Sequence, residues 1–292
     1  MPLFLQSGMR FDYAIEDLHC ILAKEQVEEV SPTPSDKVLY IHQGEIAFVN
    51  KHVFDFVGSD DATTCMIVML IGVNNILLTH IDSEDRMLNL EVMLNQFILC
   101  ESLSAEFDLY VSGGIDQVSC HNMLLALLST IDSLAIVTRV RMLKVCKANM
   151  FEKEGMFSIS SYGLGYARRS NSVVPMYFPD NVRGPWLSLR NAGLWNTMGT
   201  SVLRMVHDCR RRTDQHVFIQ NFSICIPREW AQSVLSLPEQ TLLKQTSTTP
   251  LLERKRCKCL HTVSSIQNSL PTLVFSEKRK IYILVTFFIG IF

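Results

Sequence analysis

A small acidic loop that runs into an apolar segment contains the residues whose types could do chemistry. The loop is Gly58-Ser59-Asp60-Asp61-Ala62-Thr63-Thr64-Cys65, and the segment after it is Met66-Ile67-Val68-Met69-Leu70. Cys65 stands where the loop would leave its thiol accessible and the strand would hold it in a fixed position. A nucleophile needs this combination of access and fixed position.

His80 is the candidate partner of this cysteine. The next apolar segment, Ile76 to Thr79, ends in His80, and Val73-Asn74-Asn75 joins the two segments. A hairpin of two short strands would bring His80 back beside Cys65. A structural cysteine and an ordinary core or surface histidine are the alternative interpretation. A metal site through His80 and Asp82 is a weaker hypothesis, because no second histidine sits at ligand spacing.

The elements that must position these residues are mostly strands. Apolar residues at helical spacing predict helices over Met87 to Leu99, Gln117 to Leu128 and Leu251 to Asn268. Alternating and β-branched runs predict strands over Val38 to Tyr40, Ile46 to Val49, Met66 to Leu70, Ile76 to His80, Phe107 to Val111, Ala135 to Val145, Phe157 to Arg168, Val173 to Phe178 and His216 to Ile226. Many strands with few regular βα alternations indicate an α+β fold. No charged or Gly/Ser-rich linker divides the chain, so we expect a single domain over 1–292.

The composition limits the class of protein. The chain has 292 residues, 48% of them hydrophobic and 19% charged, so it can bury enough apolar surface to fold. A net charge of -2 gives no electrostatic footprint for nucleic acid or anionic lipid. The nine cysteines form no CxxC pair, and the start lacks a basic leader. We therefore expect reduced thiols, no zinc ribbon and no secretory signal.

The C-terminal run Ile281 to Phe292 is almost purely apolar. It is about a dozen residues long, whereas a membrane-spanning helix needs about 20. We therefore expect no membrane anchor, and a membrane-interfacial end is the alternative. The β-branched and aromatic residues of the run favour a terminal strand, above all in the first half.

The acidic loop closely resembles the signature of protein N-terminal asparagine amidohydrolases. Further blocks that resemble the family follow in the same order, to about Tyr282: Met1-Pro2-Leu3, Leu78 to Asp82, Phe107 to Gly114, Ser161-Tyr162-Gly163 and Leu243 to Leu251. The apolar tail at 281–292 departs from the family's polar tail. The resemblance therefore covers nearly the whole chain.

The resemblance implies an activity and a fold. The family removes the side-chain amide of an asparagine that forms the free N-terminus of a polypeptide, and it releases ammonia. The N-terminal aspartate that remains can be arginylated, which marks the protein for degradation by the N-degron pathway. The implied fold is an α-β-β sandwich, shared with cytotoxic-necrotizing-factor-type toxins and chemotaxis-receptor glutamine deamidases.

The resemblance also implies catalytic roles. Cys65 matches the nucleophile, and His80 matches the general base and acid. In the related chemotaxis deamidases a hydroxyl residue six positions before the cysteine orients the histidine, and here Ser59 holds that position. Ser59 could instead only cap or turn the loop. Proximity to His80 would lower the pKa of the Cys65 thiol, and the implied intermediate is a thioester.

Substrate contacts are expected around the nucleophile. The backbone N–H groups of Thr64 and Cys65 are the natural donors to an oxyanion. Asp60 or Asp61 would bind the substrate's α-ammonium group through a charge-assisted hydrogen bond, while the other stabilises the loop. Pro2 would be exposed after loss of Met1 and lie near the site, or else belong to an ordinary N-terminal strand.

The remaining expectations concern partners and alternatives. We expect no metal or organic cofactor, no nucleic acid and no membrane partner. Substrates would be proteins or peptides with N-terminal asparagine, with the arginylation and ubiquitin-ligase machinery acting downstream. A monomer in the cytoplasm, and also in the nucleus, fits the family. The alternatives are a deamidase of internal glutamine or asparagine, and an inactive binding protein of the same fold.

Overall fold

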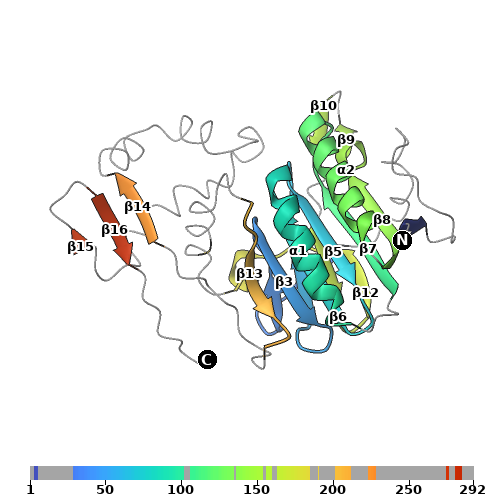
Figure 1. Ribbon diagram of the computed structural model, residues 1–292, viewed down its shortest axis with the longest axis horizontal. Coiled ribbons are helices and arrows are strands. Elements are labelled where there is room, and N and C mark those ends of the chain that lie inside the picture. The colour runs from blue at the N-terminus through green and yellow to red at the C-terminus, as the bar shows by residue number, and fades with distance from the viewer. Residues whose placement is uncertain are drawn as a thin grey trace. The chain divides into compact units, whose positions relative to one another are not determined.

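The chain forms two compact units in the computed structural model (Figure 1). Unit 1 comprises residues 1–185 and 199–218, and unit 2 comprises 186–198 and 219–292. The structure describes residues 3–5, 29–101, 106–134, 136–153, 156–159, 163–184, 190, 201–211, 223–227, 274–275 and 280–284. The expected single domain over 1–292 stays a prediction.

A mixed seven-stranded sheet is the centre of unit 1. Its order is β1 (Leu3–Leu5), β8 (Val137–Val145), β7 (Glu106–Gly113), β5 (Met66–Ile71), β6 (Asn75–Ile81), β3 (Glu45–Asn50) and β13 (Arg204–Asp208). Strands β7, β5, β6 and β3 are successive antiparallel neighbours, whereas β1, β8 and β7 run parallel, as do β3 and β13. The central strand β5 is buried on both faces, so it is apolar at every position.

Two helices cover one face of this sheet (Figure 1). Helix α1 (Met87–Ile98) and helix α2 (Val118–Ser133) turn apolar residues at helical spacing towards it. They share one core cluster with the residues of β5 that face them, Met66, Val68 and Leu70. Burial of each such apolar side chain contributes about 1.5–3 kcal/mol to the free energy of unfolding.

A four-stranded sheet packs on the opposite face. Its order is β12 (Ser172–Pro175), β11 (Leu164–Ala167), β4 (Phe56–Ser59) and β2 (Val38–Tyr40). The second core cluster lies between the sheets and contains the alternate residues of β5 and β6, including Ile67, Met69 and Leu78. Cys65 belongs to this second cluster, so the face opposite the helices is the one that positions the candidate nucleophile.

The other elements are short. Unit 1 also contains η2 (Glu84–Arg86), η3 (Cys146–Asn149), η4 (Asp180–Val182) and the hairpin of β9 (Met150–Lys153) and β10 (Met156–Ile159). In unit 2, β16 (Lys280–Leu284) lies between β14 (Ser223–Pro227) and β15 (Val274–Phe275) and is antiparallel to both. Among the described residues, no helix is both long enough and apolar enough to cross a membrane.

Most sequence-based elements are confirmed, with instructive differences. The mixed composition of many strands and few helices agrees with the α+β prediction, and the hairpin of β5 and β6 forms as expected. The start of the apolar tail is a strand, as predicted. Gly58 and Ser59, which we expected in a loop, belong to β4, because both pair with β11. The helix expected over Leu251 to Asn268 lies outside the described residues.

Candidate active site

The pairing of β5 with β6 brings Cys65 close to His80. Ile67 lies directly opposite His80 in the antiparallel ladder, and Cys65 precedes Ile67 by two residues. Residues two positions apart share a face of the sheet, so Cys65 and His80 are diagonal neighbours. Such neighbours have Cα atoms about 7–8 Å apart, which side chains can span.

The backbone of Cys65 is fixed against β7. Its carbonyl oxygen accepts a hydrogen bond of 2.7 Å from the Gly114 N–H. Gly113 has a φ of +113°, and a Cβ atom there would lie 2.3 Å from the same carbonyl oxygen. Only glycine accommodates both this dihedral angle and this close approach. The glycine pair at the end of β7 therefore determines where Cys65 stands.

Ser59 determines the proton position on His80. The Ser59 Oγ donates to the carbonyl oxygen of Ile41 at 2.6 Å and lies 2.8 Å from His80 Nδ1. A hydroxyl has one proton to donate, so we assign the proton of the second contact to Nδ1, with Oγ as acceptor. In this tautomer His80 Nε2 carries the lone pair that a general base needs. All three residues are buried.

Burial keeps the Cys65 thiol protonated in the resting structure. The side chain is 7% exposed. Burial and then the charge of Asp82 raise the pKa of Cys65 to about 12, although a hydrogen bond from Thr64 and the charge of Arg86 partly oppose the shift. The expectation that its pKa is lowered is therefore wrong for this resting structure, because desolvation outweighs any stabilisation of the thiolate.

Asp82 adds a fixed negative charge beside the pair. It follows β6 and stands opposite Cys65 when the register is extended by one residue. Arg86 binds both of its carboxylate oxygens, and Gln43 donates to one of them at 3.1 Å. Burial alone would raise the pKa of Asp82, but the bonds and charge of Arg86 make the net shift downward. Asp82 is therefore an ionised group close to the site.

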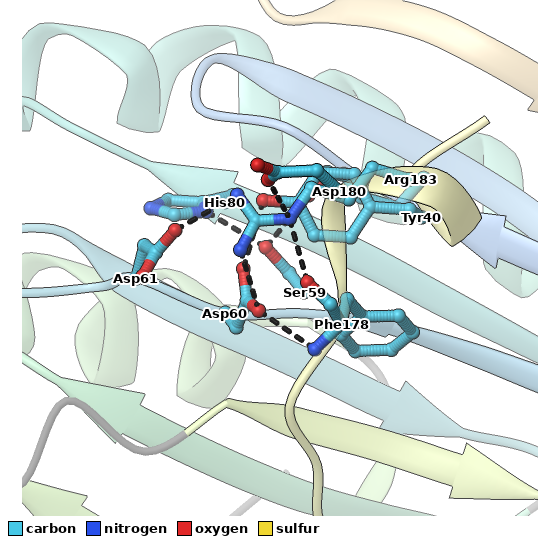
Figure 2. A network of polar contacts seen from close by, with 9 residues as sticks. Tyr40, Ser59, Asp60, Asp61, His80, Phe178, Asp180 and Arg183 are labelled. Atoms are coloured by element: carbon cyan, nitrogen blue, oxygen red, sulfur yellow. Dashed lines mark hydrogen bonds and ion pairs between the residues drawn. The ribbon is translucent and has the colours of Figure 1, made fainter. Parts of the chain in front are cut away.

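Three protein groups donate hydrogen bonds to the carboxylate of Asp60 (Figure 2). Its carboxylate accepts from the Tyr40 hydroxyl at 3.0 Å, the Phe178 N–H at 2.8 Å and Arg183 Nη2 at 3.0 Å. Its side chain is 3% exposed. Burial and the charge of Asp61 raise the pKa of Asp60 to about 6, while Arg183 acts in the opposite direction. Three donors around a buried carboxylate indicate that Asp60 holds the loop in place.

Asp61 is the more open of the two aspartates. It accepts a bond of 2.9 Å from Arg183 Nη1, and its side chain is 24% exposed. Its backbone is left-handed, with φ of 59°. Aspartate tolerates this conformation better than most residues, yet it is uncommon outside glycine. The Asp61 side chain is thus held by Arg183 and stays partly exposed to solvent.

Of the other two residues expected to contact the substrate, the structure describes Thr64 but not Pro2. Thr64 lies next to Cys65, and its carbonyl accepts a bond of 3.4 Å from the Cys120 thiol at the start of α2. Pro2 lies outside the described residues.

Sequence reasoning missed Tyr40 and Arg183, which complete the network around the acidic loop. Arg183 follows η4 and lies 122 positions from Asp61 along the chain. No local pattern marks either residue, so only the fold reveals them.

The chain is similar to known proteins of one family. A family model described as protein N-terminal asparagine amidohydrolase matches residues 26–278. The protein N-terminal asparagine amidohydrolase of Homo sapiens is 26% identical over 278 residues, covering 91% of this chain and 82% of that protein. The protein of the same name from Arabidopsis thaliana is 35% identical over 92 residues, covering 30% of this chain but only 26% of that protein. Because the family match spans most of its length, the chain belongs to the protein N-terminal asparagine amidohydrolase family.

Proposed function

We propose that this protein deamidates the side chain of N-terminal asparagine in proteins and peptides, with Cys65 as nucleophile. The observation that carries the proposal is the 2.8 Å contact between Ser59 Oγ and His80 Nδ1, on the strand beside Cys65. It leaves Nε2 as the basic nitrogen of His80. Membership of the amidohydrolase family supplies the substrate.

The first half-reaction forms a thioester. His80 Nε2 takes the thiol proton of Cys65, and the sulfur bonds to the side-chain carbonyl carbon of the asparagine. The carbonyl oxygen becomes an oxyanion, for which the N–H groups of Thr64 and Cys65 are the proposed donors. His80 then protonates the amide nitrogen, the C–N bond breaks, and ammonia leaves.

The second half-reaction returns the enzyme to its starting state. His80 Nε2 takes a proton from water, and the hydroxide oxygen bonds to the thioester carbon. The C–S bond breaks, and His80 returns the proton to the sulfur of Cys65. The product is a polypeptide that begins with aspartate.

The electrostatics support proton transfer within the pair rather than a preformed thiolate. The pKa of Cys65 is raised to about 12 by burial and by Asp82, so the free thiolate is disfavoured. The same Asp82 charge stabilises an imidazolium on His80, because the two groups attract one another. The ion pair of thiolate and imidazolium is therefore favoured over either charge alone.

Asp61 is our candidate for binding the α-ammonium group. Its side chain is 24% exposed, whereas that of Asp60 is 3% exposed and receives three protein donors. An ammonium group bound to a carboxylate makes a charge-assisted hydrogen bond. A substrate whose first residue is acetylated lacks this charge. We propose Pro2 as a further contact, from the family resemblance alone.

The wider role follows from the product. An N-terminal aspartate is suited to arginylation, so we propose that the enzyme feeds the N-degron pathway as a monomer in the cytoplasm and nucleus. We also propose that the layering of two helices, a seven-stranded sheet and a four-stranded sheet is the fold of the cytotoxic-necrotizing-factor-type and chemotaxis-deamidase cysteine hydrolases.

The test is a deamidation assay on the full chain. A peptide beginning with a free asparagine is incubated with the protein, and released ammonia and the small mass gain are measured together. Wild type is expected to be active, Cys65→Ala inactive, and Cys100→Ala close to wild type. Cys100 is a suitable control because it follows α1 and its thiol donates to the Gln96 carbonyl of that helix. Activity in Cys65→Ala would overturn the nucleophile assignment.

The same assay separates the alternative functions. Equal turnover of a free and an acetylated asparagine peptide would favour a deamidase of internal residues. A folded wild-type protein without activity, whose Cys65 reacts with a thiol probe no faster than the other cysteines, would favour an inactive binding protein.

A further inference from the structure

Arg183 uses its whole guanidinium group to connect the acidic loop to the end of the four-stranded sheet (Figure 2). Its Nε donates to the Phe178 carbonyl at 2.8 Å, Nη1 donates to Asp61 at 2.9 Å, and Nη2 donates to Asp60 at 3.0 Å. The guanidinium carbon lies 5.1 Å from the centre of the Tyr40 ring. The side chain is only 2% exposed, so each of these contacts is made away from bulk water.

The network around Arg183 contains two acidic side chains. Two carboxylates, Asp60 and Asp61, face one guanidinium, and Tyr40 stays neutral because burial and the charge of Asp60 raise its pKa. Asp180 also lies 3.6 Å from Arg183 Nε, but it is 91% exposed and its charge is screened by water. The substrate's α-ammonium group would bring a positive charge to these carboxylates.

The orientation of Asp61 depends on Arg183. Asp61 has a left-handed backbone conformation, which is energetically costly for most residues. Arg183 Nη1 is the donor that fixes the inner side of that carboxylate. A guanidinium holds two carboxylates in a planar fork, which a lysine ammonium cannot reproduce. A variant of Arg183 can therefore change the orientation of the Asp61 carboxylate without removing the charge of Asp61.

We propose that Arg183 is a specificity-determining positioning residue, whose guanidinium holds the Asp61 carboxylate in the direction that receives the substrate's α-ammonium group. It acts through Asp61 and does not touch the reacting atoms. The proposal rests on the proposed deamidation of N-terminal asparagine. It goes further by assigning the choice of a free N-terminus to a residue outside the loop that contains Cys65.

The test compares two peptides that differ only at the α-amino group. One begins with a free asparagine, and in the other hydrogen replaces the α-amino group of that residue. The ratio of their kcat/KM values measures discrimination for the ammonium group. A purely structural loss of Arg183 would lower both kcat/KM values together and leave the ratio unchanged.

Arg183→Lys is the first variant. We expect it to lower the discrimination ratio by about 10- to 100-fold, since a hydrogen bond to a charged group contributes about 1.5–3 kcal/mol. The kcat/KM value for the deamino peptide should change little. Arg168→Gln is the control, because Arg168 pairs with Asp55 at an exposed position. It should leave both values as in wild type.

A matched double variant separates position from charge. Arg183→Gln alone leaves two carboxylates facing one another, which can prevent folding. Asp60→Asn combined with Arg183→Gln keeps the net charge of the wild type but removes the fork. We expect this variant to lose discrimination although the charge is conserved. Melting temperatures confirm that each assayed variant is folded.

A double-mutant cycle of Asp61 and Arg183 tests whether Arg183 acts through Asp61. Asp61→Asn should lower the ratio, and adding Arg183→Lys should lower it no further. A further drop would show that Arg183 acts on the substrate by another route, which would overturn the proposal. Wild-type discrimination in the Asp60→Asn/Arg183→Gln variant would also overturn it.

Failure of the further inference is distinguishable from failure of the proposed function. If wild type releases ammonia from the free asparagine peptide but shows no preference over the deamino peptide, the positioning role is wrong and the deamidase assignment stands. If wild type releases ammonia from neither peptide, the proposed function itself is wrong.

Discussion

A single hydroxyl group, that of Ser59, decides which nitrogen of His80 carries the proton. Its own proton goes to the Ile41 carbonyl, so the contact with Nδ1 must be an acceptor contact. The role of Ser59 is therefore more than packing. An alanine would fill most of the same space but would leave the His80 imidazole able to adopt the other tautomer.

We expect Ser59→Ala to lower kcat by about 100-fold with little change in KM. The physical reason is that the general base no longer presents Nε2 to Cys65 in every molecule. Steady-state kinetics with a free asparagine peptide measure both constants. Ser133→Ala, at the exposed end of α2, is the control. A Ser59→Ala enzyme with unchanged kcat would rule out the orienting role.

Ionisation of Asp60 predicts a pH dependence of substrate binding. Its pKa is raised to about 6 by burial and by Asp61, so lowering the pH through about 6 adds a proton and removes one negative charge from the network. The substrate's α-amino group, with a pKa of about 7.7–8.0, stays charged over this range. We therefore expect KM for a free asparagine peptide to rise as the pH falls below about 6.

The deamino peptide and the Asp60→Asn variant serve as the comparisons for this pH dependence. Neither should show the acid rise in KM, because one lacks the cation and the other lacks the titrating carboxylate. Identical pH profiles for both peptides with the wild-type enzyme would contradict the assignment.

The residue scale also shows what sequence reasoning can find. The spacing between Cys65 and His80 fits a tight hairpin, and local geometry was enough to place the two side by side. Arg183 carries no such signal, since it reaches Asp61 across 122 positions through the packing of η4. Contacts of this length depend on the tertiary structure rather than on local periodicity.

At the scale of elements, the glycine pair that ends β7 positions Cys65, the candidate nucleophile. Gly113→Ala would place a Cβ atom 2.3 Å from the Cys65 carbonyl oxygen, at a φ of +113°. We expect a loss of about 1–3 kcal/mol in the free energy of unfolding from the backbone conformation alone. Activity should fall further than stability, because the clash displaces Cys65 itself. Denaturant unfolding and kcat measured together test this.

Gly72→Ala is the matched control at the other end of the β5–β6 hairpin. A Cβ atom there would meet the flexible side chain of Glu101 at 2.7 Å. It should therefore lower stability but spare kcat. If Gly113→Ala and Gly72→Ala lost activity in equal proportion to stability, the positioning role of the glycine pair would be excluded.

Strands β4 and β13 escaped prediction for different physical reasons. Strand β4 ends in Gly58 and Ser59, which favour turns. It forms because its whole length pairs with β11 and its first three residues pair with β2. Strand β13 is rich in polar residues, yet it adds to the sheet edge in parallel with β3, where Arg204 pairs with the buried Glu45. Tertiary pairing overrode the local preference in both cases.

At the scale of the whole molecule, every described residue of the candidate site lies in unit 1. Ending the chain at residue 279 removes β16, through which β14 and β15 are joined. We expect hydrogen exchange in β14 to become fast, because it loses its neighbouring strand, while β5 and β6 stay protected. Turnover of a free asparagine peptide should be retained.

Hydrogen exchange and the ammonia assay on the shortened and full chains make the comparison. Lost turnover with β5 and β6 still protected would mean that unit 2 contributes directly to the site. Retained protection in β14 would mean that another segment replaces β16.

The hydrogen bond between Ser59 and His80 joins the two sheets of unit 1, since Ser59 lies in β4 and His80 lies in β6. The proposed catalytic apparatus therefore exists only where the sheets are stacked in register. During refolding, far-ultraviolet circular dichroism would recover when each sheet has formed, whereas turnover would recover only when they dock. Enzymatic activity in this protein is thus a direct reporter of side-chain packing between layers, and it should lag behind secondary structure in a stopped-flow experiment.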